Sequence, residues 1–147
     1  YKTPMDKKAI ITRFIGTNLE FVSKEFALEF KKTHNLSTNQ MSAIWYLREK
    51  PGMKMIDLAN KMQMSRQQMT KLVDSLEEKN LVERQINEAE RRSVILFDTD
   101  EAYQIIDAMQ QAYYGRLLGK LEKLSNEDQD RFFESLDFIT NTFISIN

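Results

Sequence analysis

The sequence predicts a mainly α-helical fold that carries one small β-hairpin. Apolar residues recur at steps of three and four positions over most of the 147 residues, which is typical of amphipathic helices. Ser or Thr residues that can cap a helix stand before most of these stretches. The exception is the segment from Leu81 to Phe97, where two stretches rich in β-branched and apolar residues flank a short polar stretch, as in a hairpin.

The first predicted element is a long amphipathic helix over residues 4–33. Thr3-Pro4-Met5-Asp6 is typical of a helix start, with Thr as cap and Pro at the first helical position. A second helix is predicted to begin at Ser37-Thr38-Asn39-Gln40, which has the pattern of a capping box, and to end before Pro51.

Two helices separated by a short link are predicted next. The first is short, with apolar residues between Ile56 and Met62, and Lys54 at its start offers no capping side chain. The second begins at another capping box, Ser65-Arg66-Gln67-Gln68, and is predicted to run to about Lys79. Asn80 tolerates the left-handed conformation that often ends a helix.

The rest of the chain is predicted to form the hairpin and two long helices. Leu81–Ile86 and Arg92–Phe97 are the expected strands, with a charged tip between them. Thr99 and Ser125 are the expected caps of the last two helices. The final helix has apolar residues at near-heptad spacing, which suits packing against another helix. These residues are Phe132, Leu136, Ile139, Phe143 and Ile146.

Composition excludes several classes of site. The chain has no Cys, so disulfides, thiolate metal sites and a cysteine-based redox switch are excluded, and a cytoplasmic location fits. No run of about 18 apolar residues suggests a membrane span, and the first residues show no apolar signal region. Because the chain does not begin with Met, we expect further residues before Tyr1.

The charges are unevenly distributed around a net charge of −1. Five cations and one acid lie between Lys50 and Lys71, whereas residues 98–147 hold 4 basic and 10 acidic residues. A DNA-binding protein needs a local positive surface rather than a high overall isoelectric point. A solvated surface of mixed charge explains the same counts, so both interpretations stay open.

The order of elements is that of a winged helix-turn-helix, in which the second helix of the motif enters the major groove. Gln67, Thr70, Lys71 and Asp74 share one face of the fourth predicted helix, because they are three, four and seven positions apart. We expect that face to contact base edges, to which Gln and Lys can hydrogen-bond. An ordinary polar outer face explains the helix equally well when it is considered alone. The predicted major-groove residues are Gln67, Gln68, Thr70 and Lys71.

Three further predictions concern phosphates and the minor groove. Ser65 and Arg66 stand at a helix start, where free N–H groups favour a phosphate. Arg91 and Arg92 at the hairpin tip are expected to enter the minor groove, whose negative potential attracts arginine. Arg84, at the base of the hairpin, is expected to contact the DNA backbone. The alternative at the tip is an exposed salt bridge, which contributes little.

With these motifs the sequence resembles the multiple antibiotic resistance regulator (MarR) family. The family's hairpin motif of Asp, two variable residues, Asp, Arg and Arg corresponds here to Asn87-Glu88-Ala89-Glu90-Arg91-Arg92. Asp57-Leu58-Ala59 matches its acid-Leu-Ala signature, Leu72-Val73-Asp74 its recognition helix and Leu81-Val82-Glu83-Arg84 its first wing strand. The resemblance covers nearly the whole chain.

The chain departs from the family pattern at five positions. Asn87 and Glu90 replace the two acids of the hairpin motif, and we expect Glu90 still to pair with an arginine. Asn80 replaces the usual Gly, Asp98 the usual Leu and Ala102 a frequent Gly. The last two changes concern how the fifth predicted helix begins and leave the predicted fold unchanged.

The resemblance implies a single MarR-like domain over residues 1–147. Its winged helix-turn-helix covers residues 36–98, and residues 4–33 and 99–146 form long N- and C-terminal dimerisation helices. It implies a homodimeric, sequence-specific transcriptional regulator, most simply a repressor, that binds a palindromic operator in double-stranded DNA. It implies no membrane partner and no cofactor, metal site or enzymatic activity, and the single His and the lack of a Gly-rich phosphate loop agree with this.

Two questions stay open from the sequence. Family members often bind small aromatic or phenolic effectors, and five residues either line such a pocket or belong to the core. They are Phe26, Phe30, His34, Trp45 and Tyr113. The acidic last third and the near-zero net charge also allow a helical protein-interaction module whose winged helix binds no DNA.

Overall fold

The computed structural model of the protein describes Lys7 and residues 31–146, except for the side chain of Tyr113. The chain divides into two compact units, Tyr1–Met109 and Gln110–Asn147, and each is described by itself. Most of the predicted first helix, with Phe26 and Phe30, lies outside the described residues.

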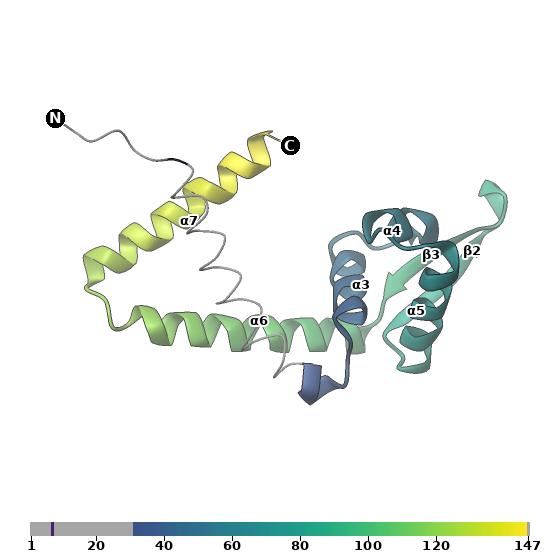
Figure 1. Cartoon of the computed structure of the whole chain (residues 1–147), viewed down its shortest axis with the longest axis horizontal. Coiled ribbons are helices and arrows are strands. Elements are labelled where there is room, and N and C mark those ends of the chain that lie inside the picture. The colour runs from purple at the N-terminus through teal and green to yellow at the C-terminus, as the bar shows by residue number, and fades with distance from the viewer. Residues whose placement is uncertain (1–6, 8–30, 147) are drawn as a thin grey trace. The chain divides into compact units, whose positions relative to one another are not determined.

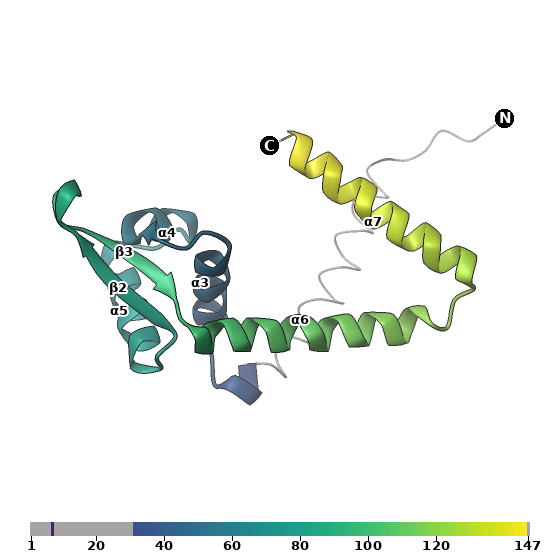
Figure 2. The same ribbon diagram turned by 180° about the vertical axis from the view of Figure 1, so that it is seen from behind.

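In the part of the first unit that the structure describes, helices α3, α4 and α5 and the start of α6 (Asp100–Leu121) accompany a small antiparallel sheet (Figure 1). Helix α3 spans Thr38–Glu49, α4 spans Met55–Lys61 and α5 spans Arg66–Glu78. The sheet has the order β1-β3-β2, with β1 at Met53–Lys54, β2 at Val82–Asn87 and β3 at Ser93–Asp98. The tip of the β2–β3 hairpin projects beyond α4 and α5 when the molecule is seen from either side (Figures 1 and 2). The predicted mainly α-helical fold with a small β wing is confirmed.

Local signals place the helix ends where the sequence predicts them. Ser37 and Ser65 each form a complete capping box, in which the Ser side chain and the Gln side chain three residues later bond to each other's backbone N–H. Lys54 precedes α4 with no side-chain cap, as expected. Asn80 has φ of 56°, the left-handed conformation predicted after α5.

Strand β1 is absent from the prediction, which expected two strands only. Its two residues pair with β3, Met53 opposite Leu96 and Lys54 opposite Ile95. Two residues are too few to show the alternation by which a strand is found in a sequence. The preceding Gly52 has φ of +78°, and its N–H donates to the Leu96 carbonyl oxygen at 3.0 Å, so this turn fixes where β1 begins.

The core of the first unit is formed by α3, α4, α5, the sheet and the first turns of the helix that begins at Asp100. Helix α5 contributes its predicted stripe to this core, and Leu96 is the fully buried residue of β3. The largest fully buried side chains are Leu36, Ile44, Leu47, Leu58, Met69, Val73, Leu76 and Leu96. Trp45, for which the core was one expectation, is half-buried, and its Nε1 donates to Glu49 Oε1 at 3.1 Å.

Helix α6 (Asp100–Leu121) begins at a cap that is tied to the end of α5. The Ala102 N–H donates to Thr99 Oγ1 at 3.2 Å, and the same hydroxyl donates to the Asn80 carbonyl oxygen at 2.7 Å. Thr99 therefore caps α6, as the sequence predicts. Asp98, which takes the place of the family's Leu, pairs with Arg48 of α3 at 3.5 Å.

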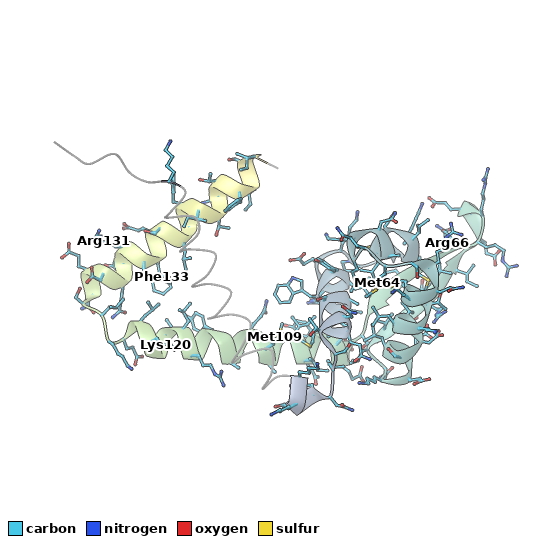
Figure 3. The ribbon with its side chains drawn as sticks, viewed as in Figure 1. Met64, Arg66, Met109, Lys120, Arg131 and Phe133 are labelled. Atoms are coloured by element: carbon cyan, nitrogen blue, oxygen red, sulfur yellow. The ribbon has the colours of Figure 1, made fainter. Side chains whose placement is uncertain are left out.

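The second unit holds the end of α6 and helix α7 (Asn126–Ile146), which Ser125 caps as predicted. None of the α7 residues that the structure describes is buried. Figure 3 shows Phe133 and Arg131 on different sides of this helix. Its exposed large apolar side chains are Phe133, Leu136, Phe138, Phe143, Ile144 and Ile146. Among the described helices, none is both long enough and apolar enough to cross a membrane.

The two capping boxes give a matched test of how burial changes the strength of a polar contact. Gln40 is 8% exposed, and besides its cap bond it donates to Ser75 Oγ at 3.0 Å, whereas Gln68 is exposed. We expect Gln40→Ala to lower the free energy of unfolding by about 1–3 kcal/mol, because it removes a buried side chain together with its bonds to Ser37 and to the partly buried Ser75. Gln68→Ala is expected to cost about 0.5–1 kcal/mol. Urea unfolding at one protein concentration measures both, and equal losses would contradict the role of burial.

Candidate nucleic-acid interface

The start of α5 presents a hydroxyl, a cation and the positive end of a helix dipole together. Ser65 Oγ accepts from the Gln68 N–H at 3.2 Å, which leaves its own proton free to be donated. Arg66, the first residue of the helix, is exposed. Figure 3 shows Arg66 on the same side of the first unit as the hairpin tip. This corner suits an anion such as a phosphate.

The outer face of α5 carries the residues that the sequence predicts for base contacts. Gln67, Thr70 and Lys71 are all exposed, opposite the buried stripe of the helix. Thr70 Oγ1 donates to the Arg66 carbonyl oxygen at 2.9 Å, so toward a ligand it offers a methyl group and an acceptor. Gln68 is also exposed, but its Oε1 accepts from the Ser65 N–H at 2.9 Å. The NH2 group of Gln68 therefore remains to donate a hydrogen bond to a ligand.

The hairpin tip is a short turn with an unusual backbone. Glu88–Glu90 form a 3₁₀ turn, which Asn87 caps by accepting from the Ala89 N–H at 3.1 Å. Arg91 and Arg92 follow with φ of 50° and 55°. Left-handed conformations cost residues other than Gly about 1–2 kcal/mol each. The turn thus holds two exposed arginines in a conformation that the chain does not favour locally.

Glu90 ties this tip to the body of the unit. The sequence predicts that Glu90 pairs with an arginine, but in the structure its Oε2 lies 2.5 Å from Nζ of Lys54 on β1. The hydrogen bond and the charge of Glu90 raise the pKa of Lys54 above its ordinary value. The prediction was wrong because the pairing of β1 with β3, which brings Lys54 near the tip, has no local signal in the sequence.

Three cations from three different elements surround one hollow beside α5. The hollow has a volume of about 400 Å³, and Lys54, Arg66 and Arg91 take part in its lining. Ser93 Oγ is buried and has no hydrogen-bond partner. Most of the remaining lining is apolar, from Met55, Ile56, Ala59, Met69 and Val94. Two of the five cations counted between Lys50 and Lys71 therefore lie around one hollow with Arg91 of the hairpin tip.

Arg84 is placed differently from the other predicted contacts. Its side chain is 30% exposed, and it forms ion pairs with Asp74 and Glu77 of α5. Burial lowers the pKa of Arg84, but the hydrogen bonds that it donates to Glu77 and Asp74, together with the charges of these acids, outweigh that effect, so its pKa is raised. The sequence predicts a contact with the DNA backbone here, and the structure shows a cation that two carboxylates already bind.

Of the predicted effector residues that the structure describes, only Trp45 lines a hollow. Trp45 lines a hollow of about 290 Å³ with four other residues of the first unit. These are Met41, Ser42, Tyr46 and Met109. His34 is half-buried and is not part of this lining. Phe26, Phe30 and the Tyr113 side chain lie outside what the structure describes.

Residues 36–94 match the model of the MarR family. The HTH-type transcriptional regulator YfiV of Bacillus subtilis (strain 168) is 31% identical over 106 residues, an alignment that covers 72% of this chain and 66% of YfiV. The chain belongs to the MarR family. The resemblance stated from the sequence is therefore confirmed, and members of this family are non-enzymatic regulators of transcription.

Solved structures show the same fold. The transcriptional regulator Tm0710 from Thermotoga maritima has a TM-score of 0.79 at 15% identity, covering 91% of this MarR-family chain and 94% of that chain. The MepR–DNA complex from Staphylococcus aureus has a TM-score of 0.66 at 17% identity, covering 92% and 98%. At these identities the likeness shows the winged fold alone.

The link between Glu90 and Lys54 gives a testable pKa difference in this MarR-family protein. We expect Glu90→Gln to lower the pKa of Lys54 toward its ordinary value, because the hydrogen bond that Lys54 donates to the Glu90 carboxylate is the largest effect that raises it. Asp57→Asn is the matched control, since Asp57 raises the same pKa through its charge alone and by less. NMR titration of the lysine side chains measures both. Equal decreases in the two variants would contradict the pairing.

Proposed function

We propose that this protein is a homodimeric repressor that binds a palindromic operator in double-stranded DNA and is released by a small aromatic effector. The observation that carries the proposal is the exposed polar face of α5, whose Arg66 and Thr70 line one hollow with Arg91 of the wing tip. Because the operator lies on DNA, we place the protein in the cytoplasm.

Helix α5 is the proposed major-groove helix. Gln67 can bond in two places to adenine, and Lys71 can donate to the acceptors of guanine. Thr70 presents its methyl group and an acceptor, which suits a thymine methyl or a base amino group. Gln68 lines the groove with its amide donor, because its oxygen is held in the cap.

Phosphate and minor-groove contacts flank that helix in the proposal. Ser65 donates its hydroxyl proton to a phosphate, and Arg66 supplies the charge beside it. Arg91 and Arg92 enter the minor groove, where a thin hairpin can reach and where arginine is attracted. The cost of their left-handed backbone supports this assignment, since strained residues often cluster at binding sites.

The exposed apolar face of α7 supports the homodimer. Two large apolar side chains of its near-heptad stripe, Phe143 and Ile146, are 58% and 69% exposed. Contiguous exposed apolar surface marks an interaction site. A second copy that covers this face creates a two-fold dimer, whose two recognition helices match half-sites about one DNA turn, roughly 34–36 Å, apart.

The hollow beside Trp45 supports the effector. It is lined by an indole, a phenol and two thioethers, groups that pack well against an aromatic ring. A ligand shifts operator binding only if its affinity differs between the DNA-binding and the released conformations. We expect a phenolic acid to raise the melting temperature and weaken operator binding, and Trp45→Ala to abolish both effects. A panel of phenolic acids that changes neither quantity would contradict this part of the proposal.

The wing contacts are tested with the double variant Arg91→Ala, Arg92→Ala. We expect this variant to bind the DNA upstream of the protein's own gene about 10- to 100-fold more weakly than the wild type. Its affinity should also depend less steeply on salt, because each protomer loses two cations that contact DNA. Fluorescence anisotropy at several salt concentrations measures both quantities. Arg131→Ala, on α7, is the matched control. Unchanged affinity and salt slope in the double variant would refute the wing assignment.

The dimer is tested with Phe143→Ser on α7. Removing this exposed apolar side chain from the predicted near-heptad seam is expected to raise the dimer dissociation constant about tenfold or more. Ile86→Ser, on β2 of the wing, removes a side chain that is also half-exposed and is expected to change dimerisation little. Sedimentation equilibrium measures both variants. A wild-type monomer, or equal effects of the two substitutions, would count against α7 as the interface.

A further inference from the structure

Arg84 joins the wing to the proposed recognition helix. It lies on β2 opposite Leu96 of β3, two residues beyond the buried Val82. From there its Nη2 donates to Asp74 Oδ1, and its Nε donates to Glu77 Oε1. The two acceptors are three positions apart on α5, so they lie one turn apart on the same side of the helix.

The two bonds of Arg84 restrain the orientation of α5 relative to β2 as well as the distance between them. A guanidinium is planar and donates along fixed directions, so two bonds from one group restrain both position and orientation. Because the acceptors lie on successive turns, they restrain the rotation of α5 about its axis as well as its shift along β2. A single ammonium group at this position would restrain the separation but leave the rotation freer.

The charges around Arg84 argue against a phosphate contact. One guanidinium is bound by two carboxylates, which gives this cluster a net charge of −1. Its side chain is 30% exposed, while those of Asp74 and Glu77 are 55% and 36% exposed. A phosphate that approached Arg84 would therefore meet two carboxylates at similar or greater exposure.

We propose that Arg84 is a positioning residue that sets the angle and register between α5 and the wing, and that it contacts no phosphate. The inference rests on the proposed DNA-binding function. Lys71 and the wing-tip arginines must enter two grooves at once, and such contacts tolerate misplacement of only about 0.5 Å. Because Arg84 fixes α5 on β2, Lys71 and the wing-tip arginines can reach the major and the minor groove at the same time.

The sharpest test uses a substitution for which simple electrostatics and the positioning role predict opposite changes in DNA affinity. Glu77→Gln removes a negative charge, which by charge alone would strengthen binding to DNA. We expect it instead to weaken operator affinity about tenfold, because a neutral amide oxygen holds the guanidinium of Arg84 less strongly than a carboxylate does. Glu78→Gln is the matched control, an exposed neighbour on the same helix that is expected to bind the operator as tightly as the wild type or slightly more tightly. If both variants bind more tightly, the positioning role is refuted.

A second measurement separates positioning from a phosphate contact. For Arg84→Met we expect weaker operator binding with an unchanged slope of log affinity against log salt. Loss of one phosphate contact per protomer would lower that slope by about 1.8 in a dimer and would overturn the proposal. Thermal unfolding of each variant gives the folded fraction by which affinities are corrected.

A third measurement separates positioning from a purely structural role. If Arg84 aligns the wing with α5, then Arg91→Ala loses part of its effect when Arg84→Met is already present. Fully additive losses would show that the two residues act independently and would refute the inference. A wild-type protein that binds no DNA at low salt would refute the proposed function itself, which is a different outcome from any of these.

Discussion

Strand β3 is the element on which the arrangement of the first unit depends. It pairs with β1 on one edge and with β2 on the other, and its Leu96 is fully buried against the helices. Without the β1 edge Lys54 would not lie near the wing tip, and without the β2 edge Arg84 would not lie beside α5. The backbone pairing of one six-residue strand therefore decides which charged groups meet.

Two ionic contacts then act at opposite ends of the hairpin. Near its base, Arg84 holds β2 to α5, and near its tip, Glu90 holds the turn to Lys54. The contacts differ in burial, because Arg84 is 30% exposed whereas the Lys54 and Glu90 side chains are 42% and 52% exposed. The contact at the base is thus the better restraint, and the exposed pair at the tip is expected to contribute little to stability. A hairpin whose base is held to α5 and whose tip can shift slightly suits the insertion of its arginines into a DNA groove.

The sequence predicted what depends on neighbours in the chain. The capping boxes at Ser37 and Ser65, the left-handed Asn80 and the two long wing strands were all found, because each depends on residues within a few positions. Strand β1 was missed because two residues carry no pattern. Glu90 and Lys54 are 36 positions apart, and their pairing depends on a register that only the folded sheet defines.

The same distinction applies within the candidate site. The periodicity of α5 correctly placed Gln67, Thr70 and Lys71 on its exposed face. Periodicity could not show that the Thr70 hydroxyl bonds to its own helix, or that Arg84 is already bound by two carboxylates. Such facts require the directions of side chains, and they change which atoms remain for DNA.

Chemical footprinting of the protein on its operator tests the central claim most directly. Methylation interference reports guanines contacted in the major groove, and hydroxyl radicals report the protected minor groove. The proposed dimer predicts two symmetric major-groove contacts about one helical turn apart, each with a protected minor-groove segment beside it. A single asymmetric footprint, or protection of the major groove with none in the minor groove, would contradict it.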